Sequence, residues 1–424
     1  MAEGTDALDF LQRLVVAQAK GEAAVQDVIA EALSAAGCTF QSHSYLPADV
    51  PVTGEFAVAE NADPHERTAI VGTLPGTDPA CRSLLMFAHP DGEPAHDTSR
   101  WTHPPFQTTR IDGRIHGWGV ADDLAGCAAA VLAIRHLAQT PGPRGDLIFA
   151  STPSKRHARG VAALLHRGVR ADAALYLHPA ESGRGMAEIK AVTCGHLEFR
   201  VTVCGRAPDT HEPSHTAFSH LAVNPVDKAV ILHAALMALA EDRAERIRHP
   251  LIEAEVGRAS NLHVAAIQAG TMGALSRLAP ECALGCALSF PPGESPDTLR
   301  REVETALARA AQADPWMADH PPQIDWLSGV TGAEVSRDHP LWKVASGVVG
   351  RATGAEPVVN PMHTASDIRV PMIEAGIPCV GFGCLAGDLT HSGRHDEWVD
   401  AADYLRMVDV TAAIAADWCA GARE

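Results

Sequence analysis

LLMFAHPDGEPAHDTSRWTHPPFQTTRIDGRIHGWGVADDLAGCAAA, from Leu84 to Ala130, contains the most informative motifs of the chain. It opens with five apolar residues, Leu84 to Ala88, which predict a strand buried in the core. His89 follows the strand directly, and Asp91 comes two residues later. An imidazole at the carboxyl end of a core strand, with a carboxylate close enough to orient it, is a typical arrangement for a metal ligand.

A further ligand is expected from the pair Asp122 and Asp123. The pair follows the turn Gly117-Trp118-Gly119 and precedes an Ala-rich run, Gly126 to Ala133, that predicts a buried helix. Both acids therefore lie near a helix N-terminus, where the helix dipole stabilises a carboxylate that can bind cations. Taken alone, each residue has an ordinary explanation as a core histidine or a helix N-cap. Their order and spacing together indicate a metal centre.

The motifs HPD, WTHPPF and GWGVADD stand in the same order as in the zinc-dependent exopeptidases and amidohydrolases. The chain resembles this family, which includes acetylornithine deacetylase, succinyl-diaminopimelate desuccinylase, aminoacylase and glutamate carboxypeptidase. The resemblance implies an α/β fold: a mixed, largely parallel sheet flanked by helices, with an inserted α+β lid and dimerisation domain. It also implies an enzyme that uses a metal to hydrolyse an amide bond in a small N-acylated amino acid or peptide-like substrate.

The pattern along the chain agrees with this fold. Apolar runs that alternate with helical intervals are typical of a largely parallel sheet, and they occur at residues 69–74, 83–88, 146–151 and 173–177. After Thr193 the order changes to β-α-β-β-α, which resembles the family's inserted domain. We therefore expect a catalytic domain formed by residues 1–192 and 315–424, and a lid formed by residues 193–314 through which the protein dimerises.

Composition restricts the partners. The 424 residues are 46% hydrophobic, enough to bury a large core in two domains, and the formal net charge of -18 disfavours nucleic acid and anionic membranes. The N-terminal residues contain no apolar run long enough for a signal peptide or a membrane span. We expect a cytoplasmic homodimer that binds a small molecule. The ten cysteines have no CxxC spacing and are expected to be buried free thiols.

The resemblance assigns four metal ligands. His89 and Asp122 match two of them, and His178, after the strand AALYL, matches a position where relatives have Asp, Glu or His. His89, Asp122 and His178 would form a three-ligand site with an open position, the arrangement that catalytic zinc favours. His391 matches the ligand that closes the family's second metal site, and His395 is the alternative.

The chain departs from the family after the strand at residues 146–151. Relatives have two glutamates there, a general base and a ligand of the second metal, whereas this chain has Lys155 and Arg156, or Ser154 and Lys155 in the other register. A protonated lysine is no base near neutral pH, and a guanidinium repels a divalent cation. We therefore expect at most one zinc ion per chain. Lys155 and Arg156 become candidates for holding an anionic substrate, and Glu181 is a candidate for the missing base.

Three residues are candidates for substrate binding. His215, in HTAFSHLAVN, resembles the family histidine that reaches across the dimer to stabilise the oxyanion. Arg277 stands three residues before a proline where the family has Asn, while Ser289 replaces the family's arginine before the Pro-Gly-Glu turn. Arg369 lies in HTASDIR, which resembles the family's Ser/Thr-Asp-x-Arg segment, whose arginine can bind a carboxylate with two hydrogen bonds.

A second class of function follows from the loss of the glutamate pair. In this class the chain is a divergent family member with altered mono-metal or non-hydrolytic chemistry, or a binding protein without catalysis.

Overall fold

The computed structural model describes residues 2–57, 63–92, 98–154, 157–179, 182–361, 365–387 and 395–423. The chain forms two compact units, one comprising residues 1–53, 59–192 and 334–424 and the other comprising residues 54–58 and 193–333. The second unit extends beyond the expected end at residue 314, because β14 (Gln323–Val330) pairs with β11 (Gly195–Cys204).

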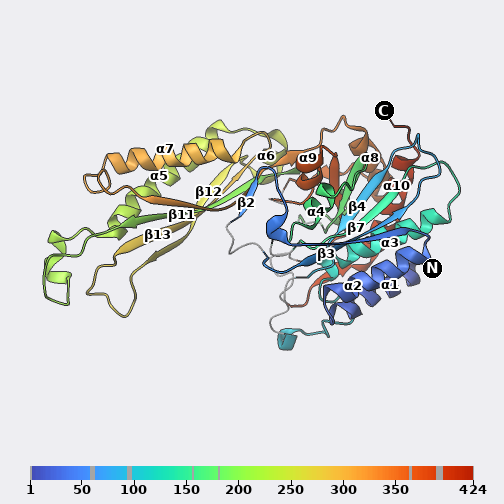
Figure 1. The fold of residues 1–424 in the computed structure, drawn as a ribbon, viewed down its shortest axis with the longest axis horizontal. Coiled ribbons are helices and arrows are strands. Elements are labelled where there is room, and N and C mark those ends of the chain that lie inside the picture. The colour runs from blue at the N-terminus through green and yellow to red at the C-terminus, as the bar shows by residue number, and fades with distance from the viewer. Residues whose placement is uncertain are drawn as a thin grey trace. The chain divides into compact units, whose positions relative to one another are not determined.

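A mixed six-stranded sheet in the order β1-β3-β7-β4-β8-β17 forms the centre of the first unit (Figure 1). The neighbours β7, β4, β8 and β17 run parallel, whereas β3 is antiparallel to both β1 and β7. This arrangement confirms the predicted fold class. The strand bounds are Thr39–Tyr45 (β1), Arg67–Leu74 (β3), Leu84–Ala88 (β4), Leu147–Ser151 (β7), Ala173–Leu177 (β8) and Cys379–Phe382 (β17).

Helices cover both faces of this sheet. α4 and α9 pack over one face, where alternate residues of the strands, such as Phe87 and Ala150, contribute to one apolar cluster. α3 packs against the other face and is buried on nearly every side, because α1, α2 and α10 lie over it. The bounds are Ala2–Gln18 (α1), Glu22–Ala35 (α2), Ala125–Ala138 (α3), Gly160–His166 (α4), Pro340–Thr353 (α8), Arg369–Ala375 (α9) and Ala401–Cys419 (α10).

The sheet order brings three strand ends together. β4 lies between β7 and β8 and is parallel to both, so the residues that follow these strands meet at one edge of the sheet. Those residues are His89, Thr152 and His178. The carboxyl ends of parallel strands are where open α/β sheets bind their ligands.

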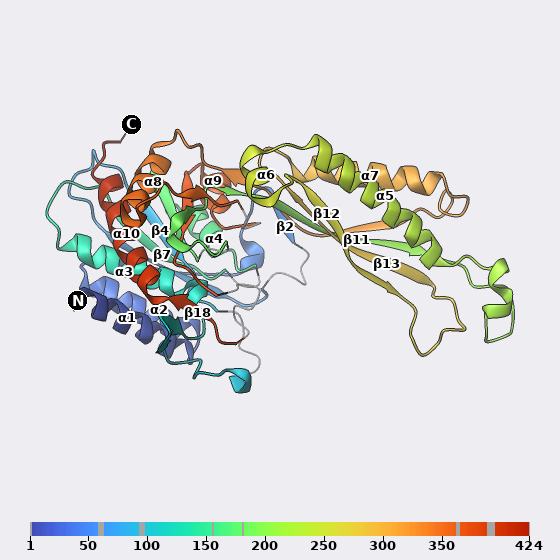
Figure 2. The ribbon, with the colours of Figure 1, turned by 180° about the vertical axis from the view of Figure 1, so that it is seen from behind.

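The second unit is a five-stranded antiparallel sheet in the order β12-β13-β11-β14-β2. The long helices α5 and α7 lie side by side along it (Figure 2), and they bury Leu232 and Leu299 against strand residues such as Phe199 and Phe290. The chain order β11, α5, β12, β13, α7 is the predicted one. The bounds are Glu55–Ala57 (β2), Asn261–Ala269 (β12), Glu281–Phe290 (β13), Pro225–Arg246 (α5), Pro250–Val256 (α6) and Pro296–Gln312 (α7).

Smaller elements complete the chain. A three-stranded sheet in the order β18-β6-β5 contains residues Trp398–Asp400, Arg114–His116 and Thr109–Ile111. The two-residue strands are Glu188–Ile189 (β9), Val192–Thr193 (β10), Ala333–Glu334 (β15) and Val358–Val359 (β16). Among the described residues, no helix has the length and apolar character required to span a lipid bilayer. All ten cysteines are free thiols, and most are buried, although Cys204 is exposed.

Candidate metal centre

His89 is buried directly after β4, with its ring fixed in one orientation. Its Nδ1 lies 2.6 Å from the carbonyl oxygen of Thr152, the residue that follows β7. Because a carbonyl oxygen only accepts hydrogen bonds, Nδ1 carries the proton and donates it. In the neutral ring the lone pair is therefore on Nε2, the nitrogen that can bind a metal, as in most metal-ligating histidines.

Asp91, which the sequence assigned to orienting His89, is held by other groups. Its carboxylate accepts hydrogen bonds from Arg67 Nη2 at 2.8 Å and from the backbone N–H of Ser154 at 3.0 Å. The Thr152 carbonyl therefore takes over the orienting role, because the Asp91 carboxylate is turned toward Arg67 and the loop after β7. Asp91 acts on His89 through its negative charge.

Asp122 and Asp123 lie in a tight turn that leads into α3. The turn spans Val120–Leu124, both aspartates have non-helical backbone angles, and the peptide bond between them is cis. The buried Glu397 holds this turn, because its carboxylate accepts the backbone N–H groups of residues 119, 121 and 122 at 2.8, 2.7 and 3.1 Å. Burial, and after it the negative charge of Asp122, raises the pKa of Glu397 to about 7.

A glycine allows α3 to approach the end of β8. A Cβ atom at Gly126, in the first turn of α3, would overlap with the carbonyl oxygen of Leu177, the last residue of β8. Only glycine lacks this atom, so the helix and the strand can touch at this point. The contact brings the turn containing Asp122 and Asp123 next to His178.

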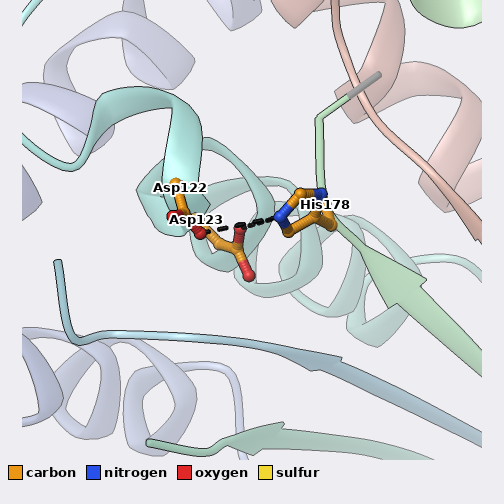
Figure 3. A group of neighbouring side chains, drawn as sticks. All are labelled: Asp122, Asp123 and His178. Carbon is orange, nitrogen blue, oxygen red and sulfur yellow. Dashed lines mark ion pairs between the residues drawn. The ribbon is translucent and has the colours of Figure 1, made fainter. Parts of the chain in front are cut away.

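His178 points toward the two aspartates (Figure 3). Its Nε2 is 3.6 Å from Oδ1 of Asp122 and 3.6 Å from Oδ1 of Asp123. These separations exceed those of charge-assisted hydrogen bonds, but two atoms that each lie about 2.1 Å from one tetrahedral ion are roughly 3.4 Å apart. Among the residues that the structure describes, these three side chains form the group able to hold a metal ion. The donors present therefore fit a divalent cation.

The Nδ1 side of His178 contacts a buried lysine that sequence reasoning missed. Nδ1 lies 3.0 Å from the carbonyl oxygen of Pro179, and Nζ of Lys190 donates to the same oxygen at 2.7 Å. Nζ is also 2.8 Å from Nδ1. The sequence feature that could have indicated this lysine is its charge within the otherwise apolar run Ile189-Lys190-Ala191-Val192.

Two carboxylates bring His89 into the same centre. Oδ2 of Asp123 accepts the backbone N–H of His89 at 3.2 Å and lies 3.8 Å from its Nε2. Oδ2 of Asp367 lies 3.3 Å from Nε2. The structure thus groups the predicted Asp122 and His178 with Asp123, which the sequence had not assigned as a ligand. The predicted His89 adjoins this group through Asp123 and also lies beside Asp367.

The charge of these carboxylates controls the protonation of His89. Burial alone would lower the pKa of His89, but the nearby carboxylates of Asp123 and Asp367 outweigh it and raise the pKa to about 9. For Asp367, burial acts to raise the pKa, yet the adjacent His89 and the charge of Arg369 hold it well below its usual range. Without a metal, a proton occupies the His89 nitrogen that a metal would bind.

Metal affinity should therefore depend on pH. Below pH 9 each bound ion displaces the His89 proton, so the affinity should rise roughly tenfold per pH unit between pH 6.5 and 8.5 and level off above pH 9. Competition with a chelator of known pH dependence measures this slope. A flat affinity over that interval would show that His89 is not a ligand.

The remaining predicted residues are distributed as follows. Lys155, Arg156, Glu181 and His391 lie outside the described residues, and His395 is half-buried and does not belong to the ligand group. Arg369 is buried as the first residue of α9, two residues after Asp367.

His215 and Arg277 belong to the second unit. The backbone N–H of Leu278 donates to Nδ1 of His215 at 3.2 Å, so the neutral ring carries its proton on Nε2 and can donate from there. The exposed Arg277 precedes Leu278 in the loop that joins β12 to β13.

Comparison with known proteins identifies the family of the chain. The sequence matches the profile of Peptidase family M20/M25/M40 over residues 85–417. The chain belongs to this family. One relative, the N-formyl-4-amino-5-aminomethyl-2-methylpyrimidine deformylase of Halalkalibacterium halodurans, is 27% identical over 372 residues, which cover 82% of each protein.

Several solved structures share the fold over nearly the whole chain. The metallo-carboxypeptidase Sso-CP2 of Sulfolobus solfataricus is 15% identical with a TM-score of 0.71, and each chain is covered to 98%. A Staphylococcus aureus tripeptidase is 16% identical with a TM-score of 0.69, and the dinuclear metal-binding peptidase YXEP of Bacillus subtilis is 14% identical with a TM-score of 0.62; for both, each chain is covered to 99%.

These findings confirm the predicted family and reaction class. The protein is a hydrolase of this family, its reaction is metal-dependent hydrolysis of an amide bond, and a metal is its cofactor.

Proposed function

We propose that this protein hydrolyses the amide bond of a small N-acylated compound with a single zinc ion held by His89, Asp122 and His178. The observation that carries the proposal is the pair of 3.6 Å separations between His178 and the two aspartates. A divalent ion bound there supplies Lewis acidity toward the amide carbonyl and acidifies water. Three protein ligands leave one position for substrate, as in other catalytic zinc sites.

Other residues of the chain are then assigned to proton transfer and to substrate binding. Glu181 takes the proton that the family's first glutamate takes in relatives, and Lys155 and Arg156 bind an anionic group of the substrate instead of a second metal. His391 belongs to that second site, which the guanidinium of Arg156 weakens. The buried Arg369 binds a carboxylate of the substrate, with Arg277 as a further cation.

The deformylase relative suggests which compounds to test first. Its name describes removal of a formyl group from an aminomethyl pyrimidine, and it covers 82% of this chain. We propose that the substrate is a small primary amine carrying a short acyl group, formyl or acetyl, and that the protein acts in the cytoplasm. Release of formate or acetate from a panel of N-formyl and N-acetyl amines and amino acids measures this activity.

The second unit is proposed to form a homodimer. Large apolar side chains are exposed on it, including Val230 on α5 and Ile267, Met272 and Leu275 on β12 and the loop after it. Burying this surface against a second copy would remove it from water. His215 of that second copy, with its proton fixed on Nε2, then donates to the oxyanion.

Light scattering at working concentration should therefore give the mass of two chains. Met272→Glu together with Leu275→Glu should shift the protein toward the monomer without unfolding it, because both side chains are exposed. A wild-type monomer would contradict the proposed assembly and the role of His215 from a second copy.

The loss of the glutamate pair can be reversed as a test of the proposed function. Lys155→Glu combined with Arg156→Glu should allow a second zinc to bind and raise hydrolysis of simple N-acetyl amino acids about tenfold or more, because a carboxylate replaces charge repulsion with coordination and supplies a base. Lys155→Ala should reduce the native activity. Lys343→Glu, on the exposed side of α8, is the matched control. If the double variant gains neither metal nor activity, these positions do not face the centre.

A further inference from the structure

We propose that Lys190 is a positioning residue that limits how strongly His178 donates to the metal, an inference that rests on the proposed function. Lys190 directly follows β9 and is 1% exposed, so its ammonium group is buried. Nζ lies 2.8 Å from Nδ1 of His178. The other ring nitrogen, Nε2, faces Asp122 and Asp123. The lysine thus contacts the ring from behind, away from the two aspartates.

The backbone holds Lys190 beside β17. Its N–H donates to the carbonyl oxygen of Gly381 at 2.7 Å, and its own carbonyl oxygen accepts the N–H of Gly381 at 2.8 Å. Gly381 pairs in turn with Tyr176 of β8, two residues before His178. The lysine side chain therefore reaches the histidine from the neighbouring strand, and backbone hydrogen bonds set its approach.

Two further contacts stabilise the buried ammonium group. Nζ donates to the carbonyl oxygen of Pro179 at 2.7 Å and lies 5.9 Å from the centroid of the Tyr176 ring. This ring is itself held by stacking on Phe87, with centroids 4.9 Å apart. A hydrogen bond and the face of an aromatic ring both lower the cost of burying a cation. Lys190 can therefore remain charged beside His178.

A cation behind a ligating histidine reverses the usual arrangement. Such histidines donate their second N–H to a carboxylate or carbonyl group, which makes the ring a stronger ligand. The Pro179 carbonyl oxygen lies 3.0 Å from Nδ1 of His178 and suits this role, but Lys190 donates to the same oxygen. A lysine has donors only, so it cannot accept the Nδ1 proton. Its charge reduces the electron density that the ring gives at Nε2, which leaves a bound ion a stronger Lewis acid.

The same contacts have an opposite explanation, in which Lys190 only fixes the Pro179 carbonyl group and thereby the orientation of His178. Lys190→Met separates the two, because it keeps a similar length but removes the charge. If the charge acts through His178, the variant should bind zinc about tenfold more tightly or better in chelator competition, since a buried positive charge no longer repels the ion. Weaker or unchanged binding would overturn the proposal.

Lys190→Gln is the second neutral variant, and it retains a donor for the Pro179 carbonyl group. It should also bind zinc more tightly than the wild-type protein, and it carries the test if Lys190→Met does not fold. Lys343→Met makes the same substitution at an exposed lysine of α8 and should leave the affinity unchanged.

Turnover of the zinc-saturated variants gives a readout that structural damage would not produce. Their kcat should fall about tenfold while KM changes little, because the ion is a weaker Lewis acid. Damage to the centre would lower both affinity and rate, whereas the proposal predicts tighter binding with slower turnover. A folded neutral variant that keeps the wild-type kcat would contradict it. A wild-type protein that binds no zinc would instead contradict the proposed function itself.

Discussion

His178→Ala should lower the rate of amide hydrolysis about 1,000-fold or more and should release the metal at concentrations that saturate the wild-type protein. The expected loss corresponds to roughly 4 kcal/mol, since each 1.36 kcal/mol changes a rate tenfold and a catalytic metal stabilises transition-state charge by several kcal/mol. We expect this large effect because His178 follows β8 directly and faces both aspartates. Rates and metal content are measured on the same samples.

His136→Ala is the control for that variant. His136 lies in α3 with its side chain exposed, so its removal should leave activity and metal binding unchanged. Retention of both metal and activity by His178→Ala would move the catalytic centre away from the ends of β4 and β8.

Gly126→Ala should destabilise the protein by about 3 kcal/mol or more and weaken metal binding as well. The added methyl group would overlap with the Leu177 carbonyl oxygen, which is backbone and cannot rotate away. Overpacking of this kind forces the helix and the strand apart. Because Asp122 and Asp123 precede α3, the displacement would also separate them from His178. Urea unfolding gives the stability change, and chelator competition gives the affinity.

Gly347→Ala provides a matched helical control. Gly347 lies in α8, where an added Cβ would meet only the end of the Arg351 side chain at 3.6 Å. Alanine is favoured over glycine in a helix by up to about 1 kcal/mol, so this variant should be neutral or slightly more stable. Equal effects of the two substitutions would show that contact between α3 and β8 does not hold the centre together.

The sequence predicted those parts of the molecule that depend on local pattern. The runs that became β4, β7 and β8 are apolar throughout because parallel strands are buried on both faces, so they stand out from their surroundings. A histidine follows two of these strands directly, and this pattern is the basis for predicting a metal centre at their ends. The β-α-β-β-α order of the second unit was visible in the same way, because each element has its own hydrophobic period.

Features that depend on tertiary contact could not be predicted from the sequence. The group that orients His89 is a backbone carbonyl. Every residue has one, so the sequence cannot show which carbonyl takes this role. Asp367 reaches His89 only through the fold, across a large separation in sequence. The predicted inserted domain ended before β14. β14 pairs with β11, which is far from it in sequence, and the pattern of a strand alone does not reveal which strand it pairs with.

Counting zinc ions per chain, while following amide hydrolysis, tests the central claim most directly. The protein is purified gently, stripped with a chelator and titrated with zinc, and bound metal is determined by mass spectrometry at each step. We expect one tightly bound zinc per chain, with hydrolysis lost on stripping and fully restored at one equivalent. Two tightly bound ions at neutral pH, or hydrolysis that persists in the metal-free protein, would contradict a single-zinc mechanism at His89, Asp122 and His178.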